Sequence, residues 1–279
     1  MYQKSSEKFI TDFKIENGVL KEYNGNSANV IIPSCVSEIG ESVFRHCKTL
    51  ESITVPDSVK SIGEMAFYDC TNLTSIIIGN GVTSIGCDVF NWCTKLTNIT
   101  VSEENQNYSS KNGILYNYDK TVLIKVPATK SFVVLPDSLT TIGFGAFMDC
   151  KSLTDITIPD NVNFIGDCAF MNCTGLKEIK IPKSIKSIGG DTFCGCSSLI
   201  NVTMPDGVTS IGFGSFAGCT NLSNIIIPDS VTSIDSGAFM GCTSLIDITM
   251  PDRVISIGSG AFYGCKNLIN IPHGIRKKD

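Results

Sequence analysis

The chain has 279 residues, of which 42% are hydrophobic and 18% charged, and its net charge is −5. This apolar fraction suffices for a packed interior, whereas the acidic balance argues against nucleic acid as a partner, because nucleic-acid binding needs a basic face. No stretch approaches the roughly eighteen apolar residues of a membrane span, so membrane insertion is not predicted.

The first 31 residues differ from the rest of the sequence. They begin without an apolar core of signal-peptide length, so the sequence as written predicts a cytoplasmic protein. Residues 17–23, Asn-Gly-Val-Leu-Lys-Glu-Tyr, echo residues 112–118, Asn-Gly-Ile-Leu-Tyr-Asn-Tyr. We predict that residues 1–31 form an N-terminal cap over the exposed apolar end of the first repeat.

From residue 32 the sequence repeats every 23 residues, with repeats 1–3 in residues 32–100 and repeats 4–9 in residues 135–272. Phenylalanine, leucine and isoleucine each fill one column of the repeat in all nine copies. The phenylalanine column consists of Phe44, Phe67, Phe90, Phe147, Phe170, Phe193, Phe216, Phe239 and Phe262. A unit of this size cannot enclose a core alone, so we predict that the units stack and bury these columns.

Each repeat contains three pieces of local structure. The pattern Leu-x-x-Ile-x-Ile-Pro predicts a short strand that ends at proline, which has no N–H to donate. The pattern Val-x-x-Ile predicts a second extended piece, and it leads to glycine in eight copies and to Asp235 in one. We expect a turn with positive φ at this position. The following Ala-Phe-x-x-Cys predicts one helical turn. The predicted fold is an α/β-type repeat solenoid, a right-handed leucine-rich-repeat superhelix that is mostly β with short helical turns.

Residues 101–134 break the period. Val101 and Leu135 occupy the same column but lie 34 residues apart, eleven more than one repeat. A polar, turn-rich segment at 105–113 precedes two β-rich runs, 113–116 and 121–126, which flank four polar residues. This pattern predicts a hairpin. We therefore interpret residues 101–134 as an enlarged hairpin-containing repeat that is continuous with the solenoid.

The last repeat runs into residues 273–279, which form a basic tail containing His273 and Arg276. Three alternatives follow for this end of the stack. A short tail closes it, the chain is cut from a longer solenoid, or the end face pairs with another molecule and causes self-association.

The repeat carries a family resemblance. Residues 227–245 contain Ile-Pro-Asp-Ser-Val-Thr-Ser-Ile, then Ala-Phe-x-Gly-Cys-Thr, then leucine. This unit closely resembles the BspA-like leucine-rich repeats, also called the Treponema pallidum type, and the match covers residues 32–100 and 135–272. The resemblance implies a non-enzymatic solenoid, and many members are bacterial surface proteins implicated in adhesion. It also implies a cell-surface or secreted location if an export signal has been removed.

Chemical sites are not predicted. Nine of the thirteen cysteines fill one repeat column, and parallel Cβ vectors fit a disulfide torsion poorly, so we interpret them as buried thiols rather than metal ligands or disulfides. His46 and His273 have no signature beside a nucleophile or a metal set. The aspartates that follow proline suit turns better than a calcium site. We predict no catalytic residue, no metal and no cofactor, and hence no enzyme.

The outward positions of the predicted strands are the candidate surface for a protein partner of unknown identity. One outward column consists of Thr54, Ile77, Thr100, Thr157, Lys180, Thr203, Ile226 and Thr249. A neighbouring column is rich in serine, asparagine and acidic residues. A third, methionine- and tyrosine-containing stripe follows the phenylalanine column, where lateral packing is an equal alternative. The leading hypothesis is protein–protein interaction with an adhesin-like role. The alternatives are end-to-end assembly and carbohydrate binding at the polar column.

Overall fold

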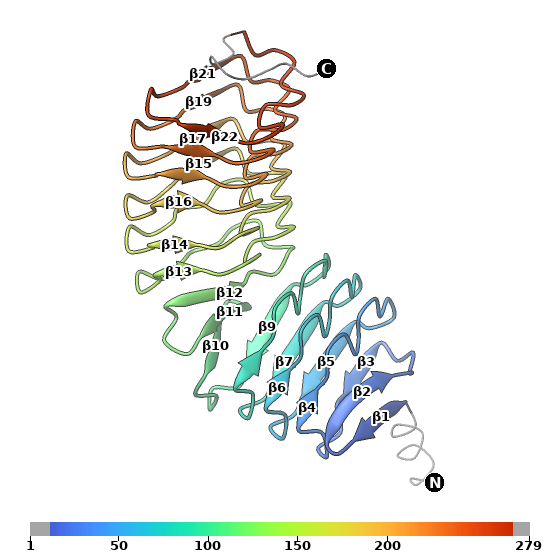
Figure 1. Cartoon of the computed structure of the whole chain (residues 1–279). Coiled ribbons are helices and arrows are strands. Elements are labelled where there is room, and N and C mark those ends of the chain that lie inside the picture. The colour runs from blue at the N-terminus through green and yellow to red at the C-terminus, as the bar shows by residue number, and fades with distance from the viewer. Residues whose placement is uncertain (1–11, 270–279) are drawn as a thin grey trace, which may run out of the picture. The chain divides into compact units, whose positions relative to one another are not determined.

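The computed structural model describes residues 12–269, which belong to two compact units. Of these residues, the N-terminal unit comprises 12–120 and 125–129, and the C-terminal unit comprises 121–124 and 130–269. Within the described residues both units consist of short strands joined by turns, without a helix (Figure 1). The basic tail and His273 lie outside the described residues.

Two rows of parallel strands build the repeats of the N-terminal unit. The front strands are β3 (Asn29–Ile31), β5 (Ser52–Val55), β7 (Ser75–Ile78) and β9 (Asn98–Val101). The back strands are β4 (Glu38–Ile39), β6 (Ser61–Ile62) and β8 (Ser84–Ile85), and they continue a hairpin of β1 (Phe13–Glu16) and β2 (Val19–Tyr23). Residues 23 apart face each other, as Ile53, Ile76 and Ile99 do. The 23-residue period of the sequence therefore determines which residues pair in the sheets.

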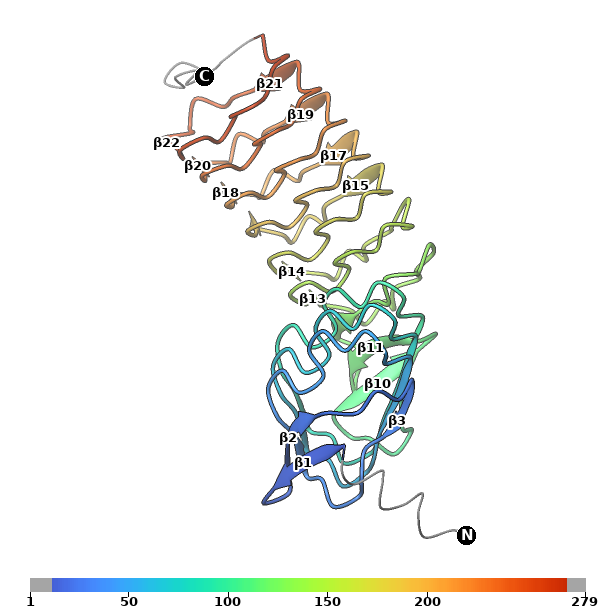
Figure 2. The ribbon, with the colours of Figure 1, turned by 90° about the vertical axis from the view of Figure 1, so that its right-hand side faces the viewer.

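The C-terminal unit repeats this arrangement, and Figure 2 shows its front and back rows on opposite sides. Its front strands are β15 (Glu178–Lys180), β17 (Asn201–Thr203), β19 (Asn224–Ile226) and β21 (Asp247–Thr249). Its back strands are β12 (Val122–Lys125, mostly in this unit), β13 (Thr141–Ile142), β14 (Phe164–Ile165), β16 (Ser187–Ile188), β18 (Ser210–Ile211), β20 (Ser233–Ile234) and β22 (Ser256–Ile257). The leucine-rich-repeat solenoid predicted from the sequence is confirmed.

The phenylalanine column forms the centre of each core. All nine rings are buried, and neighbouring rings within a unit stack face to face. Phe216, for example, lies 5.3 Å from both Phe193 and Phe239, measured between ring centroids. Each ring thus buries both faces against the preceding and following repeats, which no single repeat provides.

The described part of the leader is the β1–β2 hairpin followed by a strand. Its turn is Asn17-Gly18, with φ of 51° and 78°, as expected for an Asn-Gly hairpin. The Tyr23 ring packs 4.9 Å from the Phe44 ring and so continues the aromatic stack by one layer. The leader also supplies β3, which pairs with β5 and adds one front strand before residue 32.

The enlarged segment contains a hairpin of the same kind. Strands β10 (Tyr108–Lys111) and β11 (Ile114–Asn117) pair antiparallel around Asn112-Gly113, which explains why residues 112–118 echo residues 17–23. The sequence prediction assigned all of 105–113 to a polar turn segment. Residues 108–111 instead form a strand, whose polar composition hides it from a search for apolar alternation.

The glycine that follows the back strand is required for a reason other than the predicted one. Its φ is not positive in any of the eight copies. A Cβ at Gly166 would instead lie 2.7 Å from the backbone nitrogen of Phe144, and one at Gly258 would lie 2.2 Å from that of Ser236. The close approach of the preceding turn of the solenoid therefore excludes a side chain here.

Positive φ occurs at two other columns of the repeat. The first lies two residues after this glycine and consists of Ser42, Met65, Asp88, Gly145, Cys168, Asp191, Gly214, Gly237 and Gly260. The second immediately precedes the column cysteine and consists of His46, Asp69, Trp92, Asp149, Asn172, Gly195, Gly218, Gly241 and Gly264. The predicted helical turn is wrong for this reason. A hydrogen-bonded turn forms instead of a helix, as in the 3.1 Å bond from the Cys219 amide to the Phe216 carbonyl, and the left-handed residue, here Gly218, lies inside this turn.

Candidate functional site

The outward positions of the front strands expose side chains of varied type. In the C-terminal unit Lys180, Thr203, Ile226 and Thr249 are exposed on successive front strands, and Thr157 is exposed one repeat earlier. In the N-terminal unit Ile77 and Thr100 are exposed, while Thr54 is half-buried. The structure therefore places all eight predicted residues in outward positions of this column, on two units.

A groove of about 1030 Å³ runs over this face of the C-terminal unit. It brings together three of the predicted residues, Thr157, Lys180 and Thr203. Its charged lining residues are Asp155, Asp160, Lys177, Glu178 and Lys180. The groove is thus lined by both carboxylates and ammonium groups, together with threonine hydroxyls and the amide of Asn201. Such a lining suits a partner with mixed charge better than a purely anionic or purely apolar one.

Exposed apolar side chains also occur at the edge of this groove and in the repeats before and after it. Ile226 is 74% exposed on β19, and Ile200 at the groove edge is also exposed. Phe132 and Val134, one repeat before Asp155 and Thr157, are 73% and 63% exposed. Large exposed apolar side chains near one another are typical of protein-binding surfaces.

Sequence reasoning missed Phe132, Val134 and, in the N-terminal unit, Ile31. Each lies 23 residues before an outward residue of the repeats: Ile31 before Thr54, Phe132 before Asp155 and Val134 before Thr157. The signal that locates them is present, because Ile31-Ile32-Pro33 and Val134-Leu135-Pro136 match the end of the repeat strand. Extending each column by one repeat would have found all three.

The methionine- and tyrosine-containing stripe is not a continuous surface. Met148 is buried, Tyr68 and Met171 are half-buried, and only Met240 and Tyr263 are exposed. The aspartates after proline are exposed. Asp57 shows how such a carboxylate is used, since its Oδ1 accepts a 2.8 Å hydrogen bond from the backbone amide of Asn80 in the next repeat.

The cysteine column is part of the fold. Most of its thiols donate to the carbonyl of the phenylalanine in the preceding repeat, as in the 2.9 Å contact from Cys70 Sγ to the Phe44 oxygen and the 3.2 Å contact from Cys219 Sγ to the Phe193 oxygen. Burial raises the pKa of Cys93 to about 12 and that of Cys219 well above its usual value. Residues 12–269 contain no group of three or more histidine, cysteine or acidic side chains placed to hold a metal ion.

This burial predicts selective thiol chemistry. Cys35 and Cys87 are exposed, whereas most column cysteines are buried. With a disulfide reagent near pH 8 we expect these two thiols to react fast in the native chain and all thirteen to react in denaturant, because only accessible thiolate attacks. Mass spectrometry of the labelled peptides identifies the sites. Fast labelling of Cys173 or Cys219 in the native chain would contradict the buried column.

The family model described as "BspA type Leucine rich repeat region" matches residues 14–132, 125–245 and 197–277, with six copies. The chain belongs to the BspA-type leucine-rich repeat family. Comparison with curated proteins gave no match.

Solved structures share the BspA-type fold. A leucine-rich repeat protein from Eubacterium ventriosum is 25% identical, with a TM-score of 0.68, and the match covers 94% of this chain and 91% of that one. A leucine rich cell surface protein from Faecalibacterium prausnitzii is 23% identical, with a TM-score of 0.52 over 93% and 91% of the two chains. The pneumococcal vaccine antigen PcpA is 19% identical, with a TM-score of 0.59 over 86% and 66%. The described part of this BspA-type chain includes no helix long and apolar enough to cross a membrane.

Proposed function

We propose that this BspA-type protein is a non-enzymatic module that binds a protein partner through the front strands of its C-terminal unit. The observation that carries the proposal is the composition of that face. Ile226 and Val134 expose most of their side chains to solvent in the repeats beside a groove that both acidic and basic side chains line. Exposing such side chains costs hydrophobic free energy that a partner would recover on covering them.

An adhesin-like role is the form of this function that the family favours, since many members act in adhesion at bacterial surfaces. The repeat columns support a binding role in a second way. Burial and register fix the phenylalanine, leucine and cysteine columns, while the outward columns vary from threonine to lysine to isoleucine. Variation on a fixed scaffold is the arrangement by which repeat proteins build extended binding surfaces.

Ile226→Asp tests the proposal, with Ile255→Asp as a matched control. Both isoleucines are in the C-terminal unit and exposed, at 74% and 88%, but Ile226 lies on a front strand and Ile255 directly precedes back strand β22. The full chain and both variants are immobilised and incubated with extract from the native cells or their host, and bound proteins are quantified. We expect Ile226→Asp to lose proteins that the native chain and Ile255→Asp both retain.

Thermal unfolding of the same variants separates binding from folding. Because both side chains are exposed, each substitution is expected to change the free energy of unfolding by less than about 0.5 kcal/mol. Equal retention by Ile226→Asp and the native chain would refute this face as the binding surface. A large stability loss in Ile226→Asp would place that side chain in the core instead.

A further inference from the structure

The left-handed column before each cysteine differs between the two units. In the C-terminal unit its last four members are Gly195, Gly218, Gly241 and Gly264, which adopt positive φ without steric cost. In the N-terminal unit the column consists of His46, Asp69 and Trp92, with φ of 61°, 56° and 63°. A tryptophan in this conformation is an outlier among non-glycine residues. The backbone therefore does not require these side chains, and their chemistry needs another explanation.

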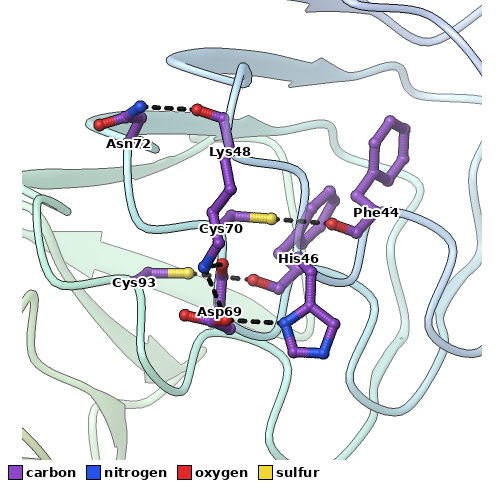
Figure 3. A network of polar contacts seen from close by, with 8 residues as sticks. Phe44, His46, Lys48, Asp69, Cys70, Asn72 and Cys93 are labelled. Carbon is purple, nitrogen blue, oxygen red and sulfur yellow. Dashed lines mark hydrogen bonds and ion pairs between the residues drawn. The ribbon is translucent and has the colours of Figure 1, made fainter.

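His46 and Asp69 lie on consecutive repeats and form a polar network with Lys48 (Figure 3). Asp69 Oδ2 lies 2.7 Å from His46 Nδ1 and 2.6 Å from Lys48 Nζ, which also donates to the Asp69 carbonyl at 3.0 Å. The hydrogen bonds from Lys48 and then His46 lower the pKa of Asp69. The backbone of the next repeat lies directly against Asp69. The Asp69 amide donates to the Asn91 carbonyl at 2.8 Å, and Trp92 is the residue after Asn91.

Two further cations and a second ring flank this network. The guanidinium carbon of Arg45 lies 5.2 Å from the centre of the Tyr68 ring, and Lys95 Nζ donates to the side-chain oxygen of Asn72 at 2.8 Å. Among residues 12–269 neither Arg45 nor Lys95 has a carboxylate within ion-pair distance. With Arg45, Lys48 and Lys95 against Asp69, the cluster carries a net charge of +2 in a chain whose total is −5.

Trp92 adds an aromatic ring, which charged groups alone do not provide. It is 38% exposed and occupies the same column as Asp69, one repeat later. A flat, amphipathic ring packs well against the C–H face of a sugar ring, while ammonium and guanidinium groups bind carboxylate or sulfate substituents at the sugar's edge.

We propose that His46, Lys48, Trp92 and Arg45 form a binding site for an acidic oligosaccharide on the turns of the N-terminal unit. Trp92 stacks on one sugar ring, and Lys48 and Arg45 bind its anionic substituents. Asp69 holds Lys48 and His46 in place from the inner side of the cluster. This site is separate from the front strands of the C-terminal unit and does not depend on their proposed role.

Trp92 is the one tryptophan of the chain, so its fluorescence reports on this site alone. The full chain is titrated with hyaluronan oligosaccharides, which carry carboxylates, with chondroitin sulfate oligosaccharides, which also carry sulfates, with a neutral maltooligosaccharide and with polyglutamate. We expect a saturable change in Trp92 emission with at least one acidic saccharide and none with the neutral one. Raising the salt concentration should weaken the binding. A response to chondroitin sulfate alone assigns the anion as sulfate, and a response to both assigns it as carboxylate.

Two pairs of variants separate the site from general charge effects. Lys48→Gln should weaken saccharide binding about fivefold. Lys151→Gln, which removes the same charge from the same column in the C-terminal unit, should leave it within about twofold. By calorimetry, Trp92→Asn should weaken binding about tenfold or more, whereas Tyr263→Asn, at an exposed ring of the C-terminal unit, should not.

Several results would overturn the site. They are no binding of either acidic saccharide, binding seen by calorimetry without a change in Trp92 emission, and equal effects of the two lysine variants. Binding of polyglutamate as tight as that of the saccharides would assign the cluster to acidic peptides instead and would refute the saccharide proposal. Asparagine tolerates left-handed φ, as at Asn172, so Trp92→Asn is expected to remain folded, and circular dichroism verifies this.

Discussion

Replacing Phe216 with alanine is expected to lower the free energy of unfolding by about 3–5 kcal/mol. The ring is fully buried between Phe193 and Phe239, with interplanar angles of 14° and 4°. Removing it takes the stacking contact from both neighbouring repeats at once and leaves a cavity that the rigid turn spacing cannot close. Denaturant titration of the native chain and the variant measures the difference.

Phe213 provides the control three residues away. It is 59% exposed on the same repeat, so Phe213→Ala removes a ring of identical size with little loss of buried surface. We expect a change within about 0.5 kcal/mol. Similar losses for the two variants would mean that ring size, rather than position in the column, determines the effect, and would contradict the stacked core.

Gly166→Ala is expected to cost about 1–3 kcal/mol, because one methyl group would have to fit where the backbone of the preceding repeat already lies. The added Cβ would be 2.7 Å from the Phe144 nitrogen and 2.9 Å from the Gly143 carbonyl carbon. Neither atom belongs to a flexible side chain. The two repeats must separate locally, which stretches the 2.9 Å hydrogen bond from the Gly166 amide to the Ile142 carbonyl.

Gly190→Ala is the matched control for this effect. Gly190 also lacks a positive φ, and the nearest atom to its added Cβ is the Phe213 carbonyl oxygen at 3.7 Å. The substitution should be neutral or stabilise the fold by up to about 1 kcal/mol through the lower entropy of the unfolded chain. If Gly166→Ala proved as harmless as Gly190→Ala in the same titration, close approach would not be what excludes side chains from the Gly166 column.

Periodicity predicts the buried columns because burial imposes the same demand on every repeat. Phe170, Leu176 and Ile165 are buried where the pattern places them. Phe170 stacks on Phe147 and Phe193, and Ile165 pairs with Ile142, each 23 residues away. The outward column follows from strand alternation, which is why Ile77 and Ile226 point to solvent as expected.

Other features depend on distances between repeats, which one repeat's sequence does not contain. An invariant glycine is compatible with positive φ or with close backbone approach, and only the packing at Gly166 distinguishes the two. Strand β10 at residues 108–111 is polar, so no alternation of apolar and polar residues marks it as a strand. The His46–Asp69–Trp92 cluster arises because unlike residues share one column on adjacent repeats, a relation that a search for identical residues passes over.

Amide hydrogen exchange of the native chain and Phe216→Ala tests most directly whether each repeat draws its stability from its neighbours. The Phe193 amide donates to the Ser215 carbonyl at 2.8 Å and the Phe216 amide to the Ala238 carbonyl at 2.7 Å, so these bonds join successive repeats. The variant should exchange faster in peptides around Phe193 and Phe239 as well as around residue 216, while peptides around Phe44 keep their native rates. Faster exchange confined to the substituted repeat would contradict a core shared between repeats.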